Sequence, residues 1–221
     1  MNQPLTIVEI RVLGSLVEKQ LSTPDYYPMT LNGLTSACNQ KNNRDPVTSF
    51  NQTTVLRALD LLREKKLIGT VTGAGIRTPK YKHYVDEVHS LSRPQVTLIC
   101  LLMLRGPQTV GELRGRSGPM HTFASVEEVE STLTALANRD SGLLVRKIPR
   151  LRGQKEARFA HLLSGTPDVK ESDISPAQEP ARLEVITENE RLAALEEEVR
   201  SLKQTLEDLR KQFSGFRKQF E

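Results

Sequence analysis

Residues 49–68, SFNQTTVLRALDLLREKKLI, decide the fold of this chain, and residues 125–148, SVEEVESTLTALANRDSGLLVRKI, repeat their pattern. In both stretches, apolar residues spaced for one face of a helix are soon followed by an apolar segment typical of a strand. The two helical stripes are displaced by a constant 74 residues: Val55, Leu59 and Leu62 in the first copy, and Val129, Leu133 and Leu136 in the second. A pattern repeated at constant spacing predicts two copies of one structural unit.

One start signal for helices occurs at five places along the chain: a Ser or Thr followed three residues later by Glu or Gln. Each side chain of such a pair caps a free backbone amide in the first turn. Because each pair precedes a helical apolar pattern, the five together predict a helix-rich body. The pairs are Thr6/Glu9, Ser49/Gln52, Ser92/Gln95, Thr109/Glu112 and Ser125/Glu128.

The two halves of the body have the same order of elements. In the first half we predict helices over residues 6–21, 30–39 and 49–65, then strands at 67–68 and 80–85 around a turn at residues 73–75. In the second half we predict helices over residues 93–104, 109–117 and 125–139, then strands at 143–148 and 158–163. Even the returning strands match, displaced by 78 residues: Tyr81, His83 and Val85 against Phe159, His161 and Leu163.

Three helices closed by a two-stranded hairpin form the winged-helix variant of the helix-turn-helix. The sequence therefore predicts a mainly α protein with small β-hairpins (α+β), built as two tandem winged-helix domains, residues 1–90 and 91–165. Ile7, Ile10, Leu13, Leu16 and Val17 form the inward stripe expected for the first helix. Residues 166–182 are rich in Pro, Ser and acidic residues and are expected to be a disordered linker.

Residues 183–221 are predicted to form a coiled-coil helix. Their apolar residues alternate in steps of three and four, the 3.5-residue period of a left-handed coiled coil. We expect this helix to pair with a second copy of the chain, giving a dimer; folding back onto the chain's own body is the alternative. The oligomerisation residues are Leu192, Leu195, Val199, Leu202, Leu206, Leu209 and Phe213.

Charge divides the chain into a basic body and an acidic tail. Residues 1–165 hold 22 Lys and Arg against 14 Asp and Glu, whereas residues 166–221 hold 9 against 13. No apolar run approaches the roughly 20 residues that a membrane span needs, and the start of the chain lacks a signal-peptide pattern. Cys38 and Cys100 lie within helical patterns and are expected to be reduced core residues. We therefore predict a cytoplasmic protein.

The polar run Cys38-Asn39-Gln40-Lys41-Asn42-Asn43-Arg44-Asp45-Pro46 leads into the third helix. With Pro28-Met29-Thr30-Leu31-Asn32 and Gly111-Glu112-Leu113-Arg114, it resembles the YceH family of uncharacterised bacterial tandem winged-helix proteins. The resemblance covers residues 4–165. It implies the fold and implies almost nothing about an activity.

No pattern of catalytic residues is visible, so we predict that the chain is not an enzyme and binds no cofactor. A phosphate-binding loop and a nucleophile elbow are both absent. The four histidines lack metal-ligand spacing with each other or with the cysteines, so no metal site is expected. His83 and His161 occupy matching positions, which favours a shared structural role.

Nucleic-acid contacts are expected mainly from the predicted hairpins, which act as wings. Winged helices read bases with the third helix and contact phosphates through basic wing residues. In the first half the candidates are Lys41, Asn43, Arg44, Thr53, Thr54, Arg57, Arg77, Lys80 and Lys82; pairing of Arg44 with Asp45 is the alternative for that arginine. In the second half they are Arg146, Lys147, Arg150, Arg152, Lys155 and Arg158, all on the wing.

The third helix of the second half is a poor reader of DNA, because Glu127, Ser131, Thr134 and Asn138 face outward beside Glu128 and Glu130. Two classes of function follow. The first is a DNA-binding protein, regulatory or not, that contacts duplex DNA with little sequence specificity. The second is a protein-interaction module resembling the tandem winged-helix accessory subunits of chromosome-segregation complexes, in which the acidic helix and the coiled coil bind protein partners.

Overall fold

The computed structural model describes residues 4–73, 77–139, 142–150 and 154–166. The chain divides between residues 174 and 175 into two units, and every described residue belongs to the first. The oligomerisation residues of 192–213 and the linker from residue 167 onward lie outside the described residues, so the predicted coiled coil stays a prediction.

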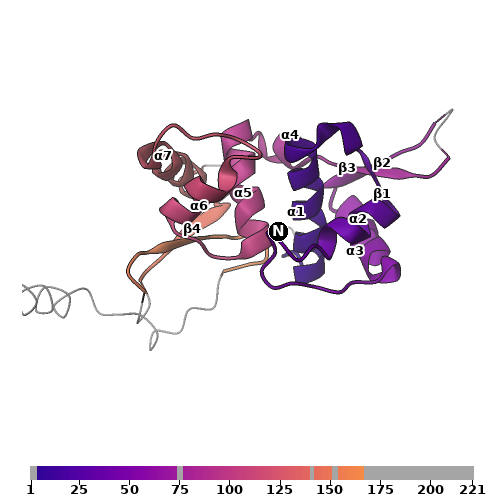
Figure 1. Ribbon diagram of the computed structural model, residues 1–221, viewed down its shortest axis with the longest axis horizontal. Coiled ribbons are helices and arrows are strands. Elements are labelled where there is room, and N and C mark those ends of the chain that lie inside the picture. Colours follow the sequence, from indigo (N-terminus) through magenta and orange to yellow (C-terminus); the bar gives the residue numbers. More distant parts are fainter. Residues whose placement is uncertain (1–3, 74–76, 140–141, 151–153, 167–221) are drawn as a thin grey trace, which may run out of the picture. The chain divides into compact units, whose positions relative to one another are not determined.

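The described unit is a mixed α+β structure that is mainly helical with small antiparallel sheets, as predicted. Its first half contains α1 Ile7–Ser22, a 3-10 turn Pro24–Tyr26, β1 Met29–Thr30, α2 Leu31–Cys38, α3 Gln52–Glu64, β2 Ile68–Val71, β3 Lys80–His83 and α4 Val85–His89. Its second half contains α5 Arg93–Arg105, α6 Val110–Ser117, α7 Val126–Ala137, β4 Val145–Ile148 and β5 Arg158–His161 (Figure 1). Within the described residues, no helix is long and apolar enough to cross a membrane.

Most of the expected caps are present, and one is not. Both hydrogen bonds of the capping box form at Thr6 with Glu9 and at Thr109 with Glu112. The expected cap at Ser49 is wrong, because α3 begins three residues later and Asn51 accepts the hydrogen bond from the amide of Thr54 at 2.8 Å. Asn39 explains the delay, since its side chain bonds both the N–H and the C=O of Phe50 and holds the chain extended there.

The core consists of the stripes that the sequence marked as inward, with one exception. Val55, Leu59 and Leu62 on α3 and their counterparts on α7 are all buried. Ile7 was expected to point inward and is instead 74% exposed. Leu5 takes its place: it lies just before α1, is buried, and donates its N–H to the carbonyl of Leu163 at 2.8 Å.

The repeat extends to the pairing of the strands. In the first half β3 lies between β1 and β2, whereas the second sheet pairs β4 with β5. His83 pairs with Ile68, the first residue of β2, and His161 pairs with Val145, the first residue of β4. The place of β1 is taken in the second half by an isolated bridge between Gln108 and Phe159. The matching histidines thus have equivalent positions in the two hairpins.

The two halves join where α1 packs against α5. Gly14 allows this approach, since a Cβ at that position would come within 2.9 Å of the side chain of Leu104. The thiol of Cys100 donates to the carbonyl of Gly14 at 3.4 Å. Cys38 and Cys100 are both free and buried, as predicted. The halves therefore share one continuous apolar core.

Candidate nucleic-acid interface

Hairpin 1, formed by β2, β3 and the described residues between them, carries three cations. Arg77 is exposed, while Lys80 and Lys82 are half-buried. The ammonium of Lys82 lies 4.7 Å from the centre of the Tyr84 ring. That ring covers Gly69 so closely that a Cβ there would come within 2.4 Å of the phenol oxygen. No carboxylate of the described residues forms an ion pair with any of the three cations.

The outer face of α3 has its positive charge near the start of the helix. Thr53 and Arg57 are exposed, as expected for a surface that meets a ligand. Thr54 is half-buried, and its hydroxyl donates to the Asn51 side chain at 2.9 Å. Nearer the end of α3, Asp60 forms an ion pair with Arg63 at 2.8 Å, a partner that the sequence did not suggest. Only the first half of α3 is therefore suited to approach a phosphate backbone.

Arg44 is the clearest departure from the expected site. It is buried, and its guanidinium contacts both carboxylate oxygens of Glu18, at 3.0 and 2.6 Å. It also donates to the carbonyl of Ala37 and to the side chain of Gln40. Arg44 therefore cannot reach a phosphate, and its carboxylate partner is Glu18 rather than the adjacent Asp45. An ion pair removed from water in this way holds the loop in one position.

The loop between α2 and α3 fastens the first half to the second. The N–H of Asp45 donates to the carbonyl of Leu104 at 2.9 Å, and Arg105 donates to the side chain of Asn43. From α1, Arg11 donates to the carbonyl of Pro46 at 2.6 Å. Burial, together with the nearby Arg44, lowers the pKa of Arg11. Asn43 is thus engaged with α5, which leaves Lys41 as the exposed cation of this loop.

Hairpin 2, formed by β4, β5 and the described residues between them, divides its cations into paired and unpaired ones. Lys147 lies 3.7 Å from the carboxylate of Glu130, and Arg158 lies 3.6 Å from that of Glu112. These two cations are less available than the sequence suggested, because each already has a carboxylate of its own chain. The cations without an ion pair among the described residues are Arg146, Arg150 and Lys155; Arg152 lies outside the described residues.

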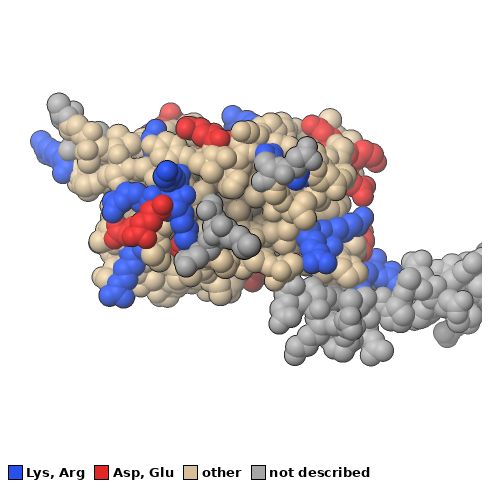
Figure 2. All heavy atoms as spheres, turned by 180° about the vertical axis from the view of Figure 1, so that it is seen from behind, with Lys and Arg blue, Asp and Glu red and all other residues tan. Residues whose placement is uncertain are grey.

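The face of α7 offers few free hydrogen-bond donors. The hydroxyls of Ser131 and Thr134 both bond back to carbonyls of their own helix, at 2.9 and 2.8 Å. Glu127 and Glu130 are exposed on the same helix. Figure 2 shows acidic side chains gathered at the end of the unit that carries α7, and basic side chains at both ends. The outer face of α7 therefore presents carboxylates and hydroxyls that are already hydrogen-bonded within the helix.

Comparison with known proteins identifies the family. Residues 5–154 match the family model described as "Protein of unknown function, DUF480". The chain belongs to this family. It is 49% identical over 199 residues to a UPF0502 protein of Geotalea uraniireducens, covering 90% of each chain. It is 50% identical over 198 residues to a UPF0502 protein of Geobacter sulfurreducens, again covering 90% of each. The expectation of an uncharacterised bacterial family is confirmed.

The matching histidines of this DUF480 protein are held neutral by their surroundings. Burial lowers the pKa of both His83 and His161 to about 4. The Nδ1 atom of His83 accepts the N–H of Val85 at 3.3 Å, and the N–H of His83 itself donates to the phenol oxygen of Tyr27 at 2.7 Å. Among the described residues no three His, Cys, Asp or Glu side chains lie close enough together to hold a metal ion.

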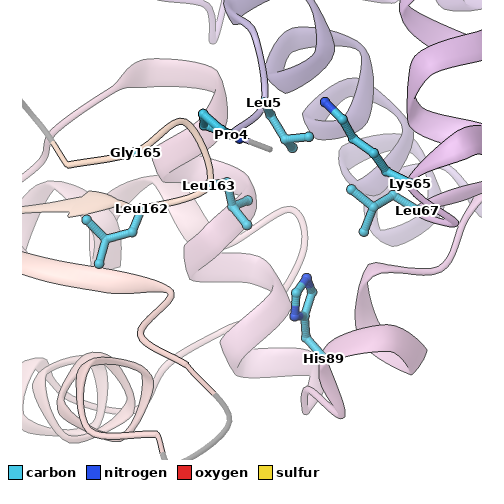
Figure 3. A pocket seen from close by; sticks show the side chains of 8 residues that line it. All are labelled: Pro4, Leu5, Lys65, Leu67, His89, Leu162, Leu163 and Gly165. Carbon is cyan, nitrogen blue, oxygen red and sulfur yellow. The ribbon is translucent and has the colours of Figure 1, made fainter. Parts of the chain in front are cut away.

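A pocket of about 360 Å³ lies where the N-terminal segment meets the end of β5. Figure 3 shows the His89 ring pointing toward the side formed by Leu67 and Leu163. Burial and the nearby Arg139 lower the pKa of His89. The other polar side chain, Lys65, already forms an ion pair with Glu9 at 2.5 Å. Among the described residues that line the pocket, none offers an unpaired charge to an ionic ligand. Its lining residues are Pro4, Leu5, Lys65, Leu67, His89, Leu162, Leu163 and Gly165.

Proposed function

We propose that this protein is a non-enzymatic, tandem winged-helix DNA-binding protein that contacts the phosphate backbone through its two hairpins. The repeated order of three helices and a hairpin supports the winged-helix assignment and the likeness to the YceH family. In this proposal the C-terminal residues 183–221 pair two chains as a coiled coil. The DNA-binding protein acts in the cytoplasm, where its wings are open to duplex DNA.

The observation that carries the proposal is the set of cations on the hairpins that have no carboxylate partner among the described residues. On hairpin 1 these are Arg77, Lys80 and Lys82, and on hairpin 2 they are Arg146, Arg150 and Lys155. Phosphate contacts made by Lys and Arg release counterions from DNA and provide affinity that does not depend on sequence. With acidic side chains on α7 and the pair Asp60–Arg63 on α3, base reading is limited to the start of α3.

A second candidate is a protein-interaction module, and one observation favours it. Leu56 and Leu61 on α3 are 39% and 43% exposed. Exposed leucines on a helix that is expected to meet DNA are more typical of a surface that binds protein. In this alternative the acidic α7 would contribute charge complementarity toward a basic partner.

A salt titration of duplex binding tests the first proposal. With roughly five phosphates engaged, the slope of log K against log salt should be about −4 to −5. Reversing the charge of Arg77 and Arg146 together should flatten this slope and weaken binding, whereas reversing the exposed Lys66, which precedes β2, should have a much smaller effect on both. If the full chain fails to bind duplex at low salt, the proposal is wrong and the protein-binding candidate gains weight.

A further inference from the structure

The two basic hairpins lie at opposite ends of the described unit. Figure 1 shows α1 and α5 in the middle, with α3 and hairpin 1 at one end and α7 and hairpin 2 at the other. The packing agrees with this view, since α1 contacts both α5 and α3, while α5 contacts both α1 and α7. The two halves therefore meet through α1 and α5, and α3 with hairpin 1 lies at the opposite end of the described unit from α7 with hairpin 2.

The α1–α5 junction keeps the two ends in this orientation. Beyond the close contact at Gly14, the N–H of Asp45 is bonded to Leu104, and the guanidinium of Arg93 donates to the carbonyl of Leu21 at 3.3 Å. These contacts tie a loop and both ends of α5 to the first half. Moving hairpin 2 toward hairpin 1 would break this buried core, so the two hairpins stay at opposite ends of the described unit.

One straight duplex cannot lie on surfaces that point away from each other. DNA is stiff over lengths of about 150 base pairs, and bending it sharply over a short distance is unfavourable. A duplex seated on hairpin 1 therefore runs on past the unit and leaves hairpin 2 free. On hairpin 2, Arg146 and Lys155 are exposed and form no ion pair with the residues that the structure describes.

We infer that a single molecule holds two duplex segments at once, one at each end, and so bridges DNA. This inference rests on the proposed function, because it needs each hairpin to bind a phosphate backbone. It adds to that function the arrangement of the partner: two separate duplex segments rather than one continuous site.

Capture of a second duplex measures bridging directly. One biotinylated duplex of roughly three helical turns is immobilised, loaded with full-length protein at low salt and washed, and a second, fluorescent duplex is then added. The wild-type chain should capture the second duplex. Two charge-reversed variants test the ends separately: Arg57→Glu with Arg77→Glu at hairpin 1, and Arg146→Glu with Lys155→Glu at hairpin 2. All four side chains are exposed, so folding should be unaffected, and circular dichroism checks this.

Each variant should still load onto the first duplex through its intact end, while capture of the second falls at least about tenfold. Both variants also carry Leu202→Asp and Leu209→Asp, which place charge in the predicted coiled-coil seam, so that a second chain cannot supply an intact end. The chain with these two seam changes alone should still capture the second duplex. Capture by a seam-changed chain with only one intact end would overturn the inference. Loading of the wild-type chain without capture would also overturn it while leaving the proposed function standing. If the wild-type chain does not load at all, the proposed function itself fails. The Lys66→Glu chain should load, and should capture far more of the second duplex than either end variant.

Discussion

In the first half the Arg44–Glu18 ion pair has side-chain exposures of 0% and 10%, whereas in the second half the Lys147–Glu130 pair has exposures of 57% and 54%. The halves share their order of helices and strands, yet the two ion pairs have different structural roles. The buried pair holds a loop against the first helix, and the exposed pair connects α7 to strand β4 of hairpin 2. The two halves thus keep the same order of helices and strands but differ in what their charged side chains contact.

Breaking the buried pair should produce the largest effect. We expect Arg44→Met to lower the free energy of unfolding by about 3 kcal/mol, because it leaves the buried carboxylate of Glu18 with only the 3.5 Å contact to Lys19. The matched change in the second half, Lys147→Met, should cost less than about 1 kcal/mol, since its pair is exposed. Denaturant unfolding followed by circular dichroism measures both.

The double variant Glu18→Leu with Arg44→Met sharpens this test. Replacing both charges by apolar side chains removes the buried carboxylate that Arg44→Met leaves with Lys19 alone, so most of the lost stability should return. Equal losses for Arg44→Met and Lys147→Met would mean that the two pairs do not differ as their burial indicates.

Acid should lower the free energy of unfolding through the buried histidine of each half, His83 and His161. The pKa of His83 is lowered from 6.5 to about 4 in the folded chain, so this residue stays neutral there while it takes up a proton in the unfolded chain. Stability is therefore fully present above pH 6.5 and falls between pH 6.5 and 4, by up to about 3 kcal/mol. His83→Asn keeps a hydrogen-bond acceptor near Val85 and should remove this share of the pH dependence. Stability curves from pH 7.5 to 4 that do not differ between the two chains would contradict the neutral assignment.

Replacing a glycine by alanine should have opposite effects on stability at the α1–α5 junction and on the surface of α6. Gly14 on α1 meets Leu104, so Gly14→Ala should lower the free energy of unfolding by about 1 kcal/mol through overpacking. A Cβ added to Gly115 on α6 would have no neighbouring side chain within 4 Å, so Gly115→Ala should raise it by about 0.5–1 kcal/mol through helix propensity. Thermal unfolding of both variants checks the opposite signs. A gain at Gly14 would show that α1 and α5 are less tightly packed than the structure indicates.

The sequence predicted what depends on local pattern and missed what depends on distant contacts. Helix order, the cap at Thr6 and the matching strands could be predicted because their signals lie within a few residues. The partner of Arg44 is 26 residues away on α1, and the adjacent Asp45 was the natural candidate from sequence alone. Ser49 and Asn51 both suit a cap, and only the contact of Asn39 with Phe50 selects between them.

The smallest effect on stability bears most directly on the second half's role. Glu130→Gln removes the carboxylate that holds Lys147, so the free energy of unfolding should change by less than about 1 kcal/mol. Duplex affinity at low salt should rise severalfold, because one more cation becomes free to contact phosphate. Glu127→Gln makes the same change of net charge on the same helix and leaves the Lys147–Glu130 pair intact. A larger gain for Glu130→Gln than for Glu127→Gln assigns the effect to the released lysine. Equal gains would assign the rise in affinity to the overall charge of α7. The pairing of Lys147 would then not contribute to the difference in free cations between the two hairpins.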